Sequence, residues 1–331
     1  MQLLRLRLPL PFKLAEINAY LVRGRQGVAL VDTGLGTPTG ERALVEALRQ
    51  HGLEPQQLRQ VFVTHYHGDH WGLAHWLQGL GARVLMPRID SEFIQSWFAR
   101  PSYDAEAIAA YGPNGVPEET AKRVARAMAQ MRAMSPRFVA DEQVEDGQHV
   151  ELAGESFEVI ITPGHTPGHA CLLHSSSQPP TLLVGDHVLP HITPNISVDL
   201  GTIADPLSAY RASLRRVRGR HVGVAYPAHG EPIRDLDGRI DEILRHHDER
   251  EQRVLELLAD DARSCFEIAV SLFELPSLDA WETWLALGET LAHLRALQTA
   301  GVVAEGEPGV WRKTDLARGR GCGGGEGHMG A

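Results

Sequence analysis

The sequence has few cysteines and no long apolar run. Its three cysteines, Cys171, Cys265 and Cys322, are far apart and odd in number, so neither a disulfide framework nor a CxxC metal site is expected. No run of about 18 apolar residues is present to span a bilayer. Residues 1–9 alternate apolar and basic side chains, which indicates a first strand and not a secretion signal. We therefore expect a cytoplasmic protein with no membrane partner.

A basic excess is also lacking. The net charge is −10, and residues 236–331 hold 18 acidic and 10 basic side chains. A segment that binds nucleic acid through its phosphates should have the opposite sign. One local basic run does occur, and we interpret it as a solvated helix face: Arg211, Arg215, Arg216, Arg218 and Arg220. Nucleic acid is therefore not an expected partner.

The overall composition, 43% apolar and 22% charged, is that of an ordinary folded protein. The 331 residues exceed the roughly 100 to 200 of a typical domain, which predicts a large domain and a smaller one. Apolar runs at 28–31 and 61–63, separated by helical spacing at 41–51, predict a layered α/β domain over residues 1–235. Further strands are predicted at 83–86, 157–161, 170–173, 181–184 and 222–225.

The strand pattern is interrupted between residues 88 and 140, where helical segments predict an inserted cap. Its larger apolar side chains are Phe93, Trp97, Phe98, Tyr103, Tyr111, Met128, Met131 and Met134. We interpret most of them as packing the insertion onto the core. The alternative, that some line a substrate pocket, stays open.

The chain becomes almost wholly helical after residue 236. Helices are predicted at 237–260, 264–272 and 278–300, and a short hairpin at 301–304 and 310–312 follows. This order is typical of a winged helix, so residues 236–315 are predicted to form a small C-terminal domain. Glycine dominates residues 316–331, which are predicted to be a disordered tail. Apolar helical surface on the insertion and on the C-terminal domain leaves a homodimer open.

The strongest functional signal is Thr64-His65-Tyr66-His67-Gly68-Asp69-His70, which directly follows the predicted strand at 61–63. Four metal-ligand side chains lie within six residues. Imidazole and carboxylate groups suit zinc, and the close spacing allows His65 and His67 to bind one metal while Asp69 and His70 bind a neighbouring one.

Three later segments supply further ligands, which a pair of zinc ions requires. They are Thr162-Pro163-Gly164-His165-Thr166-Pro167-Gly168-His169, Gly185-Asp186-His187 and Tyr226-Pro227-Ala228-His229-Gly230. Each lies at the end of a predicted strand, where an α/β sheet commonly gathers its ligands. His187 and His191 either line the substrate pocket or belong to a long packed loop. Tyr66 is a further candidate for the pocket, although a packing role is commoner for such a residue.

The motifs HxHxDH, TPGHTPGH, GD and PAHG, in this order over residues 65–229, resemble the metallo-β-lactamase superfamily, and TPGHTPGH is most similar to its glyoxalase II branch. The resemblance implies an αββα sandwich. It implies that His65, His67 and His169 bind a first metal, that Asp69, His70 and His229 bind a second, and that Asp186 bridges both. It also implies that His165 shapes the loop without binding metal, and that Asp32 holds a ligand histidine.

The expected cofactors are two Zn²⁺ ions per chain, although Mn²⁺ or Fe²⁺ would suit the same ligands. Metal binding lowers the pKa of water from 15.7 to about 7, so a hydroxide shared by two metals can attack a carbonyl or phosphoryl centre. Asp69 is the expected catalytic residue, because it would orient this hydroxide and pass a proton to the leaving group.

Two departures narrow the class of hydrolase that the resemblance implies. His67 stands where the flavodiiron branch has Glu, and Asp186 stands where true zinc β-lactamases have Cys or Ser. We therefore expect hydrolysis of a small-molecule thioester or other acyl ester, as in glyoxalase II. The alternatives are a lactonase and an endoribonuclease or other phosphodiesterase. Some members with a C-terminal winged helix cleave single-stranded RNA. A non-catalytic protein should have lost ligands, and all seven are present.

Overall fold

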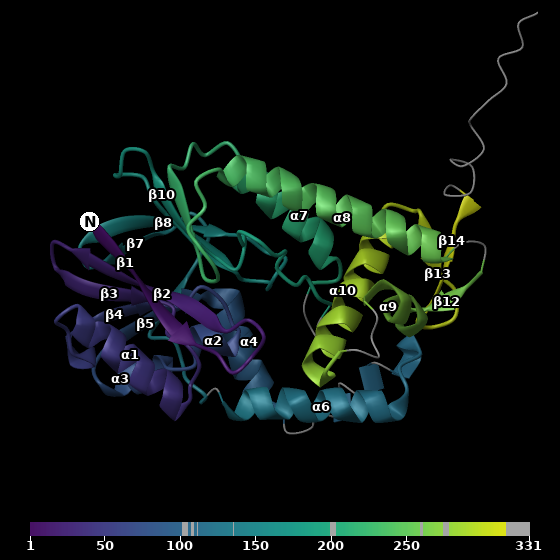
Figure 1. Cartoon of the computed structure of the whole chain (residues 1–331), viewed down its shortest axis with the longest axis horizontal. Coiled ribbons are helices and arrows are strands. Elements are labelled where there is room, and N and C mark those ends of the chain that lie inside the picture. The colour runs from purple at the N-terminus through teal and green to yellow at the C-terminus, as the bar shows by residue number, and fades with distance from the viewer. Residues whose placement is uncertain are drawn as a thin grey trace, which may run out of the picture.

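The computed structural model describes residues 1–100, 105–106, 109–110, 112–134, 136–198, 203–258, 261–273 and 278–315 (Figure 1). The predicted disordered tail at 316–331 lies outside these residues, as do Tyr103 and Tyr111 of the insertion and the side chain of Met131.

Two β-sheets form the centre of the molecule. The first has the order β1-β2-β3-β4-β5-β6, with strands Gln2–Pro9, Glu16–Gly24, Gly27–Val31, Gln60–Phe62, Arg83–Pro87 and Glu142–Val144. The second has the order β11-β10-β9-β8-β7, with strands Val224–Pro227, Thr181–Gly185, Ala170–His174, Glu155–Ile161 and His149–Leu152. Strands β3 to β6 pair in parallel, and so do β10 and β11, whereas the remaining neighbours are antiparallel.

The sheets pack face to face because their strands are apolar on both sides. Successive side chains on a strand point to opposite faces. In β2, Tyr20 and Val22 therefore lie between the sheets with Phe157 of β8, whereas Ala19 and Leu21 face the helices outside. Full burial of such a large apolar side chain stabilises the fold by about 1.5–3 kcal/mol.

Helices cover both outer faces and complete the sandwich. The first sheet is covered by α1 (Pro38–Gln50), α3 (Ala74–Gly79) and α4 (Arg88–Ala99). The second is covered by α7 (Pro206–Val217), α8 (Leu236–Leu258) and α10 (Ala280–Thr299). The layer order is thus helix, sheet, sheet, helix (Figure 1), which confirms the predicted αββα fold.

Helix α1 shows how local sequence sets these elements. Thr37 caps it by accepting a hydrogen bond from the Gly40 N–H, and Pro38 occupies the first turn, where its missing N–H costs nothing. The buried Leu44 and Leu48 lie one turn apart and face the first sheet. The helix therefore begins three residues before the predicted range of 41–51, because its cap and its proline lie outside the apolar repeat.

The insertion and the C-terminal helices lie side by side. Within the insertion, α6 (Glu118–Ala133) runs beneath α10 (Figure 1), and the Arg123 guanidinium donates a hydrogen bond to Thr283 Oγ1. After α8 come β12 (Arg263–Ser264), α9 (Cys265–Phe273), α10, β13 (Val303–Glu305) and β14 (Val310–Lys313).

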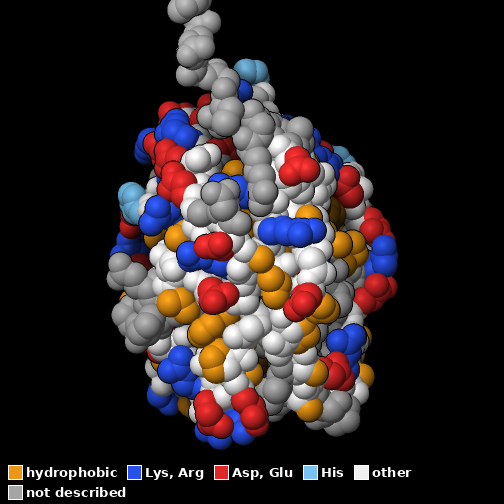
Figure 2. Space-filling model, turned by 90° about the vertical axis from the view of Figure 1, so that its right-hand side faces the viewer, with side chains coloured by type: hydrophobic (Ala, Val, Ile, Leu, Met, Phe, Trp, Pro, Cys, Tyr) orange, Lys and Arg blue, Asp and Glu red, His pale blue; other side chains and the backbone are white. Residues whose placement is uncertain are grey.

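The three short C-terminal strands pair in the order β12-β14-β13 around the buried Trp311. The three predicted helices and the hairpin are found within a few residues, and β12 is an additional strand. Figure 2 views this end of the molecule and shows acidic and basic side chains interspersed over it. Among the described residues, no helix has both the length and the apolar character needed to cross a membrane.

Candidate metal centre

The motif residues gather at one edge of the sandwich. The segment with His65, His67, Asp69 and His70 follows β4, and Asp186 and His229 follow β10 and β11. The loop with His165 joins β8 to β9. Strands β8, β10 and β11 run in the same direction, so their carboxyl ends meet at this edge. Residues that are up to 164 positions apart in sequence thereby share one site.

A first group of donor atoms belongs to His65, His67, His165 and Asp186, all within 4.8 Å of one another. His65 Nε2 lies 3.0 Å from His67 Nδ1, and His165 Nε2 lies 3.4 Å from Asp186 Oδ2. Three of these residues are buried, and His67 is half-buried.

A second group belongs to Asp69, His70 and His229, again within 4.8 Å of one another. His229 Nε2 lies 3.6 Å from Asp69 Oδ2. Asp186 lies between the groups, because its Oδ1 is 3.6 Å from His229 Nε2 and its Oδ2 is 3.6 Å from His70 Nε2. This is the position from which one carboxylate can serve two metals.

The structure places the two histidines of TPGHTPGH differently from what the resemblance implies. His165, which was expected to shape the loop only, belongs to the first donor group, whereas His169 does not. Both ring nitrogens of His169 have other partners: Nδ1 bonds Thr162 Oγ1 at 2.7 Å, and Nε2 accepts the Asp186 N–H at 3.1 Å. His169 therefore braces the backbone at Asp186 and does not present a free nitrogen to the donor group.

Contacts at Nδ1 orient three of the donor imidazoles. The Glu16 carbonyl accepts from His229, and the Asn195 carbonyl accepts from His165, each at 2.8 Å. Asp32 Oδ2 lies 2.9 Å from His70 Nδ1, so this carboxylate contacts a histidine of the HxHxDH motif, as the resemblance implies. A histidine whose Nδ1–H is held in this way presents the lone pair of Nε2 to a metal.

The cluster fits divalent metal ions. His70 Nε2, His165 Nε2 and Asp186 Oδ1 are buried and have no hydrogen-bond partner in the protein. Such atoms are costly to bury unless something binds them. The lone pairs of His70 and His165 are directed into the donor groups, and nitrogen and carboxylate oxygen are the ligands that zinc accepts. The residues present therefore fit divalent metal binding.

Electrostatics favour the metal-binding forms of two of these residues, His65 and Asp186. Burial, reinforced by the neighbouring His70 and His67, holds the pKa of His65 well below its usual value, so that its imidazole stays neutral. Burial alone would raise the pKa of Asp186, but the adjacent His229 and His70 outweigh this effect and hold it well below the usual range. Asp186 is therefore a carboxylate.

Comparison with protein families identifies the chain. Residues 14–229 match the model of the metallo-beta-lactamase superfamily, and residues 252–315 match that of the metallo-beta-lactamase-like C-terminal domain. The chain belongs to the metallo-beta-lactamase superfamily. It is a metal-dependent hydrolase with a His/Asp metal-binding cluster.

Individual relatives support this assignment. The chain is 27% identical over 298 residues to the probable metallo-hydrolase YqjP of Bacillus subtilis, covering 88% of this chain and 91% of the relative. It is 27% identical over 247 residues to the atrochrysone carboxyl ACP thioesterase of Aspergillus fumigatus, where it covers 75% of this chain but only 45% of the relative. The resemblance to glyoxalase II in particular stays a prediction.

Among solved structures, a metallo-beta-lactamase family protein from Thermus thermophilus superimposes with a TM-score of 0.82 at 33% identity, covering 94% of this chain and 98% of that one. A beta-lactamase domain protein from Burkholderia ambifaria superimposes with a TM-score of 0.79 at 28% identity, covering 94% and 92% of the two chains. The similarity therefore includes the C-terminal domain.

One residue that supports the metal centre was not predicted from the sequence. Asp90 of α4 is fully buried and accepts the Tyr66 N–H at 3.0 Å, the Thr166 hydroxyl at 2.6 Å and the Gly168 N–H at 2.5 Å. It thereby ties the HxHxDH loop to the TPGHTPGH loop. Burial raises the pKa of Asp90 to about 6, and the three hydrogen bonds oppose a larger rise.

Gly168 is required at this contact. An added Cβ would lie 2.6 Å from Asp90 Oδ1, so a side chain there would displace the carboxylate. The final glycine of TPGHTPGH thus serves the junction between the two loops, a role that the motif alone does not reveal.

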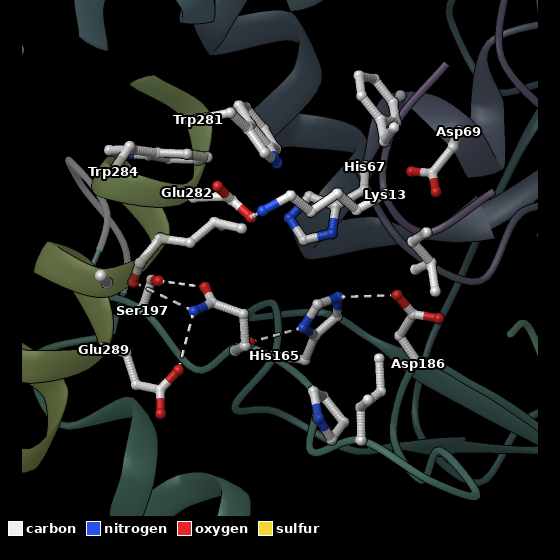
Figure 3. A pocket seen from close by; sticks show the side chains of 18 of the residues that line it. Lys13, His67, Asp69, His165, Asp186, Ser197, Trp281, Glu282, Trp284 and Glu289 are labelled. Carbon is white, nitrogen blue, oxygen red and sulfur yellow. Dashed lines mark hydrogen bonds and ion pairs between the residues drawn. The ribbon is translucent and has the colours of Figure 1, made fainter. Parts of the chain in front are cut away.

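A cavity of about 750 Å³ opens from the metal centre (Figure 3). Phe93, Trp97 and Met128 of the insertion line it, together with Tyr66. These observations support the alternative that part of the insertion faces substrate. His187 is fully buried between His169 and Tyr210 and does not line the cavity, and neither does His191.

Proposed function

We propose that this protein hydrolyses acyl thioesters with the help of two zinc ions. The observation that carries the hydrolytic part is the pair of donor groups joined by Asp186 at the end of the cavity. The thioester part is supported by the similarity to a relative named as a thioesterase and by the TPGHTPGH motif.

In this proposal His65, His67, His165 and Asp186 would hold the first metal. Asp69, His70 and His229 would hold the second, and Asp186 would contribute to both. Bound zinc supplies Lewis acidity and a water of lowered pKa, and Mn²⁺ or Fe²⁺ would suit the same donors.

The protein's own residues then position the reactants. Asp69 lines the cavity, and its carboxylate lies 3.6 Å from His229 Nε2 and 3.9 Å from His70 Nε2. We assign it as the group whose Oδ atoms take the proton of the attacking water and return it to the departing sulfur. The apolar walls of the cavity exclude competing water from the acyl group.

Cleavage of RNA has less support. Four of the five arginines in the local basic run are paired with carboxylates: Arg211 with Asp248 and Glu251, Arg216 with Asp146, Arg218 with Asp241, and Arg220 with Glu158. Paired arginines offer little free charge to a phosphate backbone. We therefore propose a small-molecule substrate.

The experiment is a rate assay of zinc-loaded protein with acyl thioesters, lactones and single-stranded RNA. Asp69→Asn should abolish thioester turnover, because the amide cannot take a proton. Asp248→Asn changes an exposed carboxylate that does not line the cavity and is the matched control. RNA or lactone cleavage that depends on Asp69, with inert thioesters, would overturn the proposal.

A further inference from the structure

We propose that the cavity binds the acyl part of the substrate as a bulky, uncharged, ring-containing group, and that the C-terminal domain recognises it through Trp281 and Trp284. This inference rests on the proposed thioesterase function. It names the acyl part as the portion of the substrate that the protein selects.

Helix α10 provides the wall opposite the metal centre. Trp281 and Trp284 lie in its first turns, three residues apart and therefore on one face, and both line the cavity (Figure 3). Their ring centroids are 4.8 Å apart. A capping box fixes the start of the helix, since Asp279 accepts the Glu282 N–H and Glu282 accepts the Asp279 N–H. The two indoles are thus held in place by the local sequence.

The loop between β1 and β2 closes the cavity against this wall. Phe12 stacks on Trp281 with a ring separation of 6.4 Å and an interplanar angle of 15°. Beside it, Lys13 Nζ lies 2.5 Å from Glu282 Oε1 (Figure 3). The insertion adds Phe93 and Trp97. Aromatic rings from three segments far apart in sequence therefore surround one space, an arrangement that favours flat apolar groups.

Size and charge narrow the ligand class. A cavity of about 750 Å³ lies within the roughly 300–1,000 Å³ of sites that enclose drug-sized ligands, so an acetyl group would leave most of it unfilled. Among the described lining residues on this side, Asp279, Glu282 and Glu289 are acidic, and Lys13 is already paired with Glu282. An anionic carrier such as glutathione would meet carboxylates here, so the acyl group is the part that enters.

The first test compares two thioesters of the same neutral carrier, N-acetylcysteamine: the acetyl ester and the 2-naphthylacetyl ester. Their reacting carbonyls are chemically similar, so the comparison isolates the acyl group. We expect kcat/KM to be at least about 10-fold higher for the naphthyl ester. Trp284→Ala should lower the ratio of the naphthyl to the acetyl kcat/KM about 10-fold, mainly by raising KM for the naphthyl ester.

Matched variants separate recognition from folding. Trp281→Ala alters the same wall and replaces Trp284→Ala in the test if that variant folds poorly. Trp281→Phe keeps an aromatic ring and should retain most of the preference for the naphthyl ester. Trp76→Phe changes a tryptophan of α3 that packs against the first sheet outside the cavity, and should change nothing. Equal kcat/KM for both esters, or a preference that survives Trp281→Ala and Trp284→Ala, would overturn the inference.

Binding measured without turnover distinguishes this inference from the proposed function. Calorimetric titration with N-methyl-2-naphthylacetamide, a neutral analogue with no thioester, should show binding that Trp284→Ala weakens about 10-fold. If no thioester is hydrolysed but this binding is found, the proposed function fails and the assignment of the cavity stands. If thioesters are hydrolysed and the amide does not bind, the assignment of the cavity fails alone.

Discussion

Replacing His165 with alanine should weaken zinc binding at one of the two donor groups by about 100-fold. His165 supplies one of four donors in the first group, and its Nε2 lies 3.4 Å from Asp186 Oδ2. Four-ligand zinc sites in peptides bind with about 10–16 kcal/mol, or about 3 kcal/mol per ligand. A loss of about 3 kcal/mol corresponds to roughly 100-fold in Kd.

Replacing His169 with alanine should have a different effect, although the two histidines share one loop. It removes the acceptor of the Asp186 N–H and the partner of Thr162, while all seven donors remain. We expect zinc affinity to fall by about 10-fold at most, because Asp186 is less well oriented. The free energy of unfolding should fall by about 1–3 kcal/mol, because a buried N–H loses its acceptor.

Zinc titration of metal-free protein in competition with a chromophoric chelator measures both sites. The wild type and His75→Ala, which removes an exposed histidine of α3, should bind two zinc ions tightly. His165→Ala should bind one tightly and one weakly. A larger loss of affinity in His169→Ala than in His165→Ala would refute the assignment.

Two further predictions concern buried titratable groups outside the donor set. Asp90→Ala should lower the free energy of unfolding by about 3 kcal/mol, because the buried Tyr66 and Gly168 N–H groups lose their acceptor. A free energy of unfolding within about 0.5 kcal/mol of the wild-type value, the range of a neutral surface change, would contradict this. Burial lowers the pKa of His247 from 6.5 to about 3, so its neutral form is favoured in the folded state. Its contribution to stability is complete above pH 6.5 and falls by about 1.4 kcal/mol per pH unit below it, as the unfolded chain takes up the proton. In urea denaturation of metal-free protein between pH 7 and 5, His247→Leu should show a correspondingly shallower loss, and an unchanged slope would count against this account.

Local patterns determined much of this protein. Short continuous runs of apolar residues were sufficient to predict the buried strands β3, β4 and β5, because a strand covered on both faces is continuously apolar. One motif was sufficient to predict a cluster of metal-binding side chains, that of His65, His67, Asp69 and His70. Residues within one short loop necessarily lie close together in the folded protein. Strands β2, β6 and β7 were not predicted, and α1 begins earlier than its apolar repeat.

Tertiary structure decided which of these residues meet and what each one contacts. The motif TPGHTPGH contains two histidines, and the choice of His165 depends on ring directions set by Asn195 and the Asp186 backbone. Asp90 reaches the site from a helix that starts some 20 residues after the HxHxDH loop. Trp284 faces the cavity because α10 packs against the insertion. Such contacts join segments distant in sequence, and composition and periodicity carry information only about neighbours along the chain.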